Sequence, residues 1–263
     1  MRGLGTSLGA LLLAGVWVAS AGAQDATAYA QVLAAHVRPG LVAGIQLAVV
    51  DYSAVKADPR YALALHDLSA ARLDALRSDA QQLAFWVNAY NLLAIKAVVD
   101  RYPVRSIKDG GSLLRPIWRK KIGTVGGREY SLDEIEHGIL RTRFREPRVH
   151  FAIVCASLSC PDLRVEPYAA ERLDLQLDDA TRRFLSNPTK GTVPSPDGRG
   201  ATVSSIFKWF AEDFGGAEGV ARFIRERAGG ELGRRLGGLT GAGLGYLDYD
   251  WSLNDARRAG GRT

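Results

Sequence analysis

This sequence of 263 residues contains only two cysteines, and several common functional signatures are missing from it. There is no glycine-rich phosphate loop, no dinucleotide-binding glycine fingerprint and no repeated pattern of metal ligands. The sequence therefore does not indicate a nucleotide-dependent protein or one with a repeated metal-binding motif, and we expect no cofactor and no metal. It also lacks internal repeats and low-complexity linkers. What is present is an apolar share of 47%, enough for one large domain with its own core.

One long apolar run stands at the start of the chain. Met1 and Arg2 are followed by an apolar stretch from Leu4 to Ala19, and then by Ala21-Gly22-Ala23, a small-x-small cleavage pattern. We expect residues 1–23 to be a cleaved signal peptide, which sends the mature chain to the periplasm or the exterior. No later run is long enough for a transmembrane segment, and no cysteine follows the leader to accept a lipid.

Basic residues outnumber acidic ones, which gives a net charge of +6 for the whole chain. The excess gathers at Arg115 to Lys121 and at Arg141 to Arg148. Such clusters suit anionic envelope polymers or lipid headgroups, but a solvated face balanced by Asp and Glu explains them more simply. Because the leader takes the protein out of the cytosol, we expect no nucleic-acid partner.

Capping signals and apolar periodicity predict mainly helices. The longest is 79–102, where a Ser78/Gln81 capping box precedes apolar positions at helical spacing. Further helices are predicted at 59–68, 131–143, 168–185, 207–214 and 220–228, and strands at 149–155, 202–206 and 246–251. Helices and strands do not alternate regularly, so the predicted class is α+β: a single domain whose central helix and surrounding helices pack on a small, mainly antiparallel sheet. We divide it into an N-terminal helical part (24–74), a core (75–252) and a loose tail (253–263).

The two cysteines, Cys155 and Cys160, lie in a serine-containing turn after the strand predicted at 149–155. In an oxidising compartment they can form a disulfide if their Cα atoms come within about 4.4 to 6.8 Å. Alternatively, Cys155 is a thiolate nucleophile activated by an imidazole. Zinc held by both cysteines and two histidines is the weakest explanation, because this spacing is wider than the common zinc patterns.

Strand geometry separates the two nearby histidines. On a regular strand His150 and Cys155 would point to opposite faces with Cα atoms about 16 Å apart, so they could not form a dyad. His137, on the preceding helix, is free to pack over the strand end, and Asp133 or Glu136 could orient it. We therefore expect His137 to be the general base, and His150 to be a core residue or part of a binding surface.

Other polar residues in these segments are candidates for binding. Asn88 and Asn91 share one face of the central helix, where they either tie the helix to neighbouring backbone or polarise a substrate carbonyl. Ser157 and Ser159 belong to the cysteine turn and, with Cys160, complete the predicted binding set.

Seven segments together carry a resemblance to a known family. They are FWVNAYN (85–91), YPVRSIK (102–108), SLDEIEH (131–137), PRVHF (147–151), CAS to CP (155–161), IFKW (206–209) and DYDW (248–251). With these motifs in order over roughly residues 75–252, the chain resembles bacterial members of the domain of unknown function 547 family. Members are often exported, and there is a looser similarity to papain-like and transglutaminase-like cysteine enzymes. In those enzymes a cysteine begins the central helix, whereas here that helix carries Asn88 and Asn91 instead.

Two functions remain open from the sequence. The first is a cysteine-dependent hydrolase or acyl transferase that acts on an amide or ester of a small molecule, peptide or envelope polymer. The second is a non-catalytic envelope binding or scaffold module with a Cys155–Cys160 disulfide and a basic face.

Overall fold

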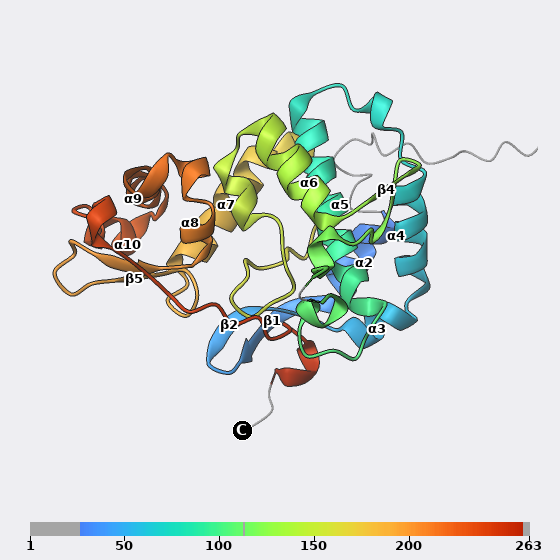
Figure 1. Cartoon of the computed structure of the whole chain (residues 1–263), viewed down its shortest axis with the longest axis horizontal. Coiled ribbons are helices and arrows are strands. Elements are labelled where there is room, and N and C mark those ends of the chain that lie inside the picture. The colour runs from blue at the N-terminus through green and yellow to red at the C-terminus, as the bar shows by residue number, and fades with distance from the viewer. Residues whose placement is uncertain (1–26, 113, 260–263) are drawn as a thin grey trace, which may run out of the picture.

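Helix α5 (Asp79–Val99) lies at the centre of the molecule in the computed structural model, which describes residues 27–112 and 114–259 (Figure 1). The predicted capping box is present, since Ser78 and Gln81 bond each other's backbone amides. The helix is confirmed, although it ends three residues before the predicted end. By length and apolar composition α5 could also cross a membrane, but most of it is buried inside the protein, as in a core helix. The predicted signal peptide lies outside the described residues.

Around α5 the N-terminal part forms three helices and a β-hairpin. The helices are α2 (Ala28–His36), α3 (Tyr52–Ala57) and α4 (Pro59–Ser69), the last as predicted. The hairpin joins β1 (Val37–Val42) to β2 (Ile45–Val50) and was not predicted. Its two-residue turn, Ala43-Gly44, has positive φ at both positions, which suits Gly but is uncommon for Ala. The sequence therefore gave only half of the usual turn signal.

The middle of the chain completes the main body. A small hairpin, β3 (Gly123–Val125) and β4 (Arg128–Tyr130), leads into α6 (Leu132–Ile135). The helix continues as a π-helix (Glu136–Phe144), so the predicted helix at 131–143 is confirmed with a wider winding in its second part. Helix α7 (Leu173–Ser186) starts later than predicted, after a short 3-10 turn.

Residues 192–246 form a C-terminal lobe beside the main body, at the left of Figure 1. The lobe contains β5 (Thr192–Pro194), β6 (Ala201–Val203), α8 (Ile206–Trp209), α9 (Gly216–Arg227), α10 (Gly230–Arg235) and β7 (Leu244–Tyr246). β5 pairs antiparallel with β6, which pairs parallel with β7. Phe151 of the main body is buried among Phe184, Phe207 and Phe223, and so joins the two parts. The chain is a single α+β domain with small, mainly antiparallel sheets, as predicted.

The strand predicted at 149–155 is wrong. Residues Pro147–Phe151 form a 3-10 helix, and the chain from there to Cys155 is irregular. Glu146 caps the turn through the amide of Arg148, and Pro147 occupies a first-turn position. The segment is apolar because it is buried, and its backbone is satisfied by an asparagine of α5 instead of a neighbouring strand.

The end of the chain also differs from its prediction. The strand expected at 246–251 overlaps β7 only at Tyr246, and the chain then runs back to the main body (Figure 1). Leu253 and Ala256 are buried, so the start of the predicted loose tail is docked, and Arg257 is the first exposed residue after it.

Candidate active site

The turn from Cys155 to Cys160 is held by the C-terminal segment. Ala156 has a positive φ of 58°, which folds the chain sharply after Cys155. The amide of Leu158 donates to the Ser252 carbonyl at 2.9 Å. The amide of Asp250 donates to Oγ of Ser159 at 2.9 Å, which gives this predicted binding residue a role inside the turn. Residues almost a hundred positions later thus fix the geometry around Cys155.

The two asparagines of α5 bond backbone groups. Asn91 donates to the Ala152 carbonyl and accepts from the Val154 amide, both at 2.9 Å, so it fixes the segment that leads into Cys155. Asn88 makes the equivalent pair of bonds with the backbone of Tyr168. Neither side chain lines the cavity described below. The structure therefore gives both residues the backbone-tying role.

The Cys155 sulfur lies among hydrogen-bond donors. The Tyr249 hydroxyl is 3.0 Å away and Oγ of Ser157 is 3.1 Å away. Burial raises the pKa of the Cys155 thiol, but hydrogen bonds from the side chains of Cys160, Ser157 and Tyr249 and from the Ser157 amide outweigh it and lower the pKa to about 7. Burial keeps the pKa of Cys160 well above its usual range. The thiolate of this pair therefore forms on Cys155.

Both cysteines are free thiols, so the disulfide considered from the sequence is absent from this structure. Cys160 instead accepts the backbone amide of Cys155 at its sulfur, 2.7 Å away. Its carbonyl accepts Nζ of the buried Lys190, which also pairs with Asp162.

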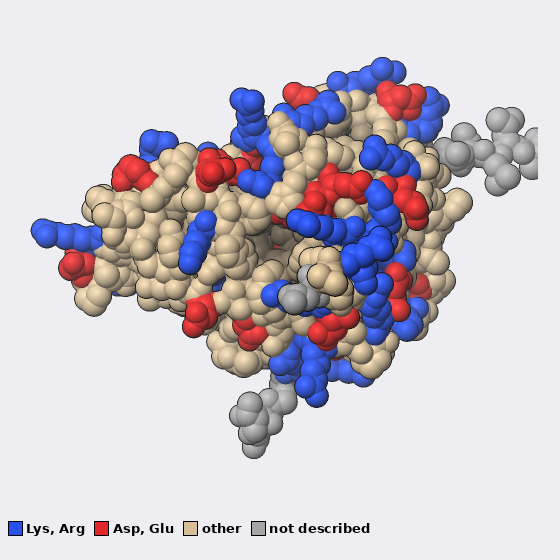
Figure 2. Space-filling view, viewed as in Figure 1, with Lys and Arg blue, Asp and Glu red and all other residues tan. Residues whose placement is uncertain are grey.

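Cys155 lines a cavity of about 190 Å³ between the main body and the lobe. A hollow is visible near the centre of the face shown in Figure 2. Six lining residues carry a carboxyl, imidazole or thiol group: Asp133, Glu136, His137, His150, Cys155 and Cys160. Aromatic rings form another part of the lining: Tyr90, Trp118, Trp209, Phe210, Tyr249 and Trp251. All four predicted catalytic residues thus meet at one cavity, together with the predicted binding residues His150 and Cys160.

His150 reaches this cavity because its segment is not a strand. The argument that alternation sends His150 and Cys155 to opposite faces therefore fails. Nε2 of His150 lies 2.7 Å from Oδ2 of Asp213, and its ring stacks on Phe210 with centroids 4.1 Å apart. Burial lowers the pKa of His150, so the ring is neutral at neutral pH. A neutral ring that donates from Nε2 leaves Nδ1 as a proton acceptor.

Asp213 is a shared anchor for this side of the cavity. It accepts from His150 and, through both oxygens, from Arg141 at 2.5 and 2.8 Å. The hydrogen bond from His150, together with those from Arg141, holds the pKa of Asp213 below its usual range. Its carboxylate is therefore ionised and matched by the Arg141 guanidinium.

His137 has a different protonation pattern. The Arg141 guanidinium lies 2.6 Å from Nδ1 of His137 and can only donate, so Nδ1 accepts and the neutral ring carries its proton on Nε2. Nε2 lies 3.7 Å from Asp133, beyond normal hydrogen-bond length. Burial, opposed by Asp133, lowers the pKa of His137. In this arrangement Nδ1 of His137 is occupied by Arg141, and the proton of the neutral ring lies on Nε2.

Glu136 is the second group in the cavity that titrates near neutrality. Burial raises its pKa to about 7, against a hydrogen bond from the Tyr90 hydroxyl at 3.1 Å. The nearby Cys155 adds to the rise, because two anions close together disfavour each other.

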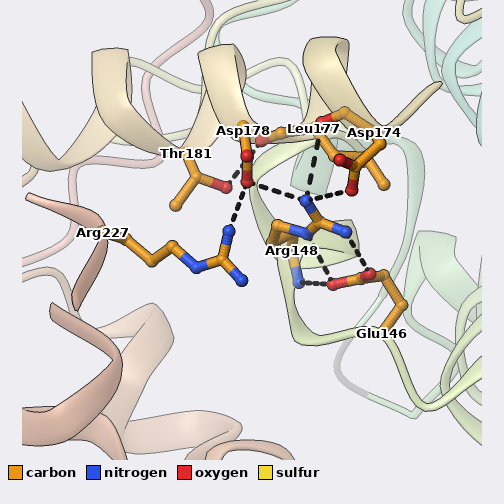
Figure 3. Close-up of polar contacts among 7 residues, drawn as sticks. All are labelled: Glu146, Arg148, Asp174, Leu177, Asp178, Thr181 and Arg227. Atoms are coloured by element: carbon orange, nitrogen blue, oxygen red, sulfur yellow. Dashed lines mark hydrogen bonds and ion pairs between the residues drawn. The ribbon is translucent and has the colours of Figure 1, made fainter. Parts of the chain in front are cut away.

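An ion-pair cluster supports the segment that carries His150 (Figure 3). The buried Arg148 bonds Glu146 at 2.6 Å and Asp178 of α7 at 2.7 Å. Asp178 also pairs with Arg227 of α9 at 2.5 Å. The cluster connects the 3-10 helix at 147–151 to α7 of the main body and to α9 of the lobe. Arg148 is one of the arginines of the basic cluster at Arg141 to Arg148.

Among the described residues no group of three or more His, Cys, Asp or Glu side chains is placed to hold a metal ion. Three of the cavity's side chains are instead paired: His137 with Arg141, His150 with Asp213 and Glu136 with Tyr90.

Residue-level reasoning missed Arg141, Phe210 and Asp213 as parts of the site. Arg141 looked like one more surface charge, and Asp213 lies 63 residues beyond His150. The motifs IFKW, in the lobe, and DYDW, in the segment that follows it, were the sequence signals for this part of the site, and they contain the cavity residues Trp209, Tyr249 and Trp251.

The fold and cavity define a single-domain α+β protein with a cysteine site enclosed between a main body and a lobe. Residues 73–185 match the sequence profile described as "Protein of unknown function, DUF547", which supports the resemblance of this part of the chain to that family. The IFKW and DYDW segments lie beyond the matched range. No curated protein and no solved structure matches the chain.

Proposed function

We propose that the protein is a cysteine-dependent hydrolase or acyl transferase in which Cys155 is the nucleophile. One observation carries the proposal: a thiol with its pKa lowered to about 7 shares a cavity with a His150–Asp213 pair. A thiolate that is substantially populated at neutral pH, in one cavity with a carboxylate-oriented imidazole, is an arrangement suited to acyl transfer.

The chemistry then divides among the cavity residues. The Cys155 thiolate attacks a carbonyl carbon, the bond to the leaving oxygen or nitrogen breaks, and an acid of the cavity protonates that leaving atom. Nδ1 of His150 accepts a proton from the incoming water or acceptor in the second step, while Asp213 holds Nε2. The proton on Nε2 of His137 is available to the carbonyl oxygen as it gains charge.

This assignment moves the general base from His137, favoured by the sequence, to His150. Arg141 already donates to Nδ1 of His137, so its ring has no free acceptor at that atom. His150 has a half-buried carboxylate partner, Asp213, 2.7 Å away. The geometry of the hydrogen bonds, and not distance along the chain, supports the change.

Acylation by 4-nitrophenyl acetate tests the proposal. We expect a burst of nitrophenol and an added acetyl group on Cys155, located by peptide mass mapping. Both should vanish in Cys155→Ala and persist in the matched Cys160→Ala variant, at a lower rate because the Cys160 side chain no longer helps to lower the pKa of Cys155. Acetyl groups found only on surface lysines, or a protein without any alkylatable thiol, would contradict the proposal.

Export to the periplasm or exterior remains part of the proposal, with an amide or ester of the envelope as the substrate. It rests on the apolar leader and the small-x-small pattern at 21–23. N-terminal sequencing of exported protein should begin at Gln24. A mature chain that retains Leu4 to Ala19 would contradict it.

A further inference from the structure

The cavity lining contains carboxyl groups and aromatic rings, but no Lys or Arg is among the described residues that line it. The Arg141 guanidinium nearby is bonded through two nitrogens to Asp213 and so brings little net charge. A substrate with a carboxylate or phosphate next to its reacting carbonyl would find no cationic partner in the lining. The charged side chains of the lining itself are thus carboxyls, and the nearby cations Lys108 and Arg141 are engaged with Trp251 and Asp213.

Four rings in mutual contact form a continuous aromatic wall of the cavity: Trp118, Trp209, Tyr249 and Trp251. Trp251 is at its centre, with ring centroids 4.6 Å from Tyr249, 5.7 Å from Trp118 and 5.8 Å from Trp209. Trp209 is 47% exposed although it is a large apolar residue. A ring cluster left this open is typical of a binding surface.

One ring of this wall already binds an ammonium group. Nζ of Lys108 lies 3.9 Å from the centroid of Trp251. An ammonium over an indole face is attracted by the negative face of the ring, and cages of such rings bind quaternary ammonium ligands. Asp133 and Glu136 line the same cavity and would add Coulombic attraction.

We propose that this site selects acyl substrates that carry an ammonium group close to the reacting carbonyl, such as aminoacyl amides or esters. The ammonium is held by the aromatic wall and by the carboxylate of Asp133, to which Glu136 adds charge when it ionises near its pKa of about 7, while the carbonyl faces Cys155. The inference rests on the proposed nucleophile and adds the charge of its substrate.

Charged thiol reagents test this selection without knowledge of the natural substrate. Methanethiosulfonates with a trimethylammonium-ethyl, a hydroxyethyl or a sulfonatoethyl group all react alike: the Cys155 thiolate attacks the sulfenyl sulfur, a disulfide forms and methanesulfinate leaves. Rates at Cys155 are read by peptide mass mapping. The rates at the same cysteine in the urea-unfolded chain correct for the intrinsic reactivity of each reagent.

We expect the cationic-to-anionic rate ratio to be at least about tenfold higher in the folded protein than in the unfolded chain. Asp133→Asn and Trp251→Leu should lower the ratio, whereas Trp251→Phe, which keeps a ring, should largely retain it. Asp74→Asn, an exposed carboxylate paired with Arg72, is the matched charge control and should leave it unchanged.

Protection provides a second measurement. Choline should slow the alkylation of Cys155 by neutral iodoacetamide, while its uncharged isostere 3,3-dimethylbutanol should not. Equal protection by both compounds would overturn the ammonium preference and leave the nucleophile in place. A cationic-to-anionic rate ratio equal to that of the unfolded chain would do the same. Failure of all three reagents to modify Cys155 would overturn the proposed function itself.

Discussion

The hydroxyl of Tyr249 lies 3.0 Å from the sulfur of Cys155, although the two residues are 94 positions apart in the chain. Oγ of Ser157 approaches the same sulfur and also lies 3.2 Å from the Tyr249 hydroxyl. A thiolate has no hydrogen, so both hydroxyls must donate to it. Residues of the turn and of the returning C-terminal segment thus jointly stabilise the charge on one atom.

Removal of the tyrosine hydroxyl should make Cys155 less acidic. Because a hydrogen bond to the thiolate lowers the pKa, Tyr249→Phe should raise it from about 7 and move the iodoacetamide rate profile to higher pH. At pH 7 labelling should slow several-fold. Tyr246→Phe removes a hydroxyl from an exposed ring of the lobe and is the control. An unchanged profile in Tyr249→Phe would show that its hydroxyl does not act on the sulfur.

Removal of the neighbouring carboxyl should have the opposite effect. Glu136 and Cys155 disfavour each other's charge, so Glu136→Gln should lower the pKa of Cys155 and move the labelling profile to lower pH. The measurement is the rate of Cys155 alkylation between about pH 5 and 9. Glu212→Gln, an exposed carboxylate of the lobe, should not move the profile. A shift to higher pH in Glu136→Gln would contradict the Coulombic link.

Asp213→Asn should weaken the His150 anchor. The variant loses charge-assisted hydrogen bonds with His150 and Arg141, which should cost about 1 to 3 kcal/mol in the free energy of unfolding at pH 7. Because the folded-state pKa of Asp213 is lowered, this contribution exists above the unfolded pKa of about 3.9 and disappears as the pH falls. Denaturant unfolding at pH 7 and at lower pH should show the gap between wild type and variant closing.

The same variant should change the titration of His150. Since Asp213 opposes the fall in pKa caused by burial, its removal should lower the pKa of His150 further, as measured by NMR. Glu212→Gln again serves as the control. A difference in unfolding free energy between wild type and Asp213→Asn that widens on acidification would contradict the pairing of Asp213 with His150 and Arg141.

Asn91→Ala should affect both stability and the reactive turn. It leaves the Ala152 carbonyl and the Val154 amide without their buried partners, at a cost of about 1 to 3 kcal/mol for each group. Asn88→Ala removes an equivalent pair of bonds at Tyr168, away from the cysteine. Both variants should unfold at lower denaturant, but only Asn91→Ala should alter the labelling rate of Cys155. Equal labelling in the two would show that Asn91 does not position the turn.

The central helix should tolerate truncation poorly. Leu83 and Val87 are buried on α5, so Leu83→Ala or Val87→Ala should each cost on the order of 1 to 4 kcal/mol, measured by denaturant unfolding. Leu63→Ala on α4, where the side chain is 52% exposed, should cost far less. Losses at both buried sites that match the Leu63 control would mean that α5 is not the centre of the core.

The sequence by itself determined where three helices begin, because their start signals are local. The capping boxes at Ser78 and Ser131 and the Asp58-Pro59 start act within one turn, and each helix begins where they place it. The sequence also predicted the turn that bears both cysteines. It assigned Cys155, His137, Asp133 and Glu136 to one site near that turn.

Only the tertiary structure decided how that neighbourhood is arranged. The apolar run at 149–155 fits a buried strand and a buried irregular segment equally well, and the choice depends on Asn91, which satisfies its backbone from α5. That choice turns His150 into the cavity, where Asp213 from the lobe meets it, and places Tyr249 on the cysteine. Hydrogen bonds between residues 60 to 100 positions apart leave no periodic trace in a sequence, so the partner of each reactive group followed from the fold alone.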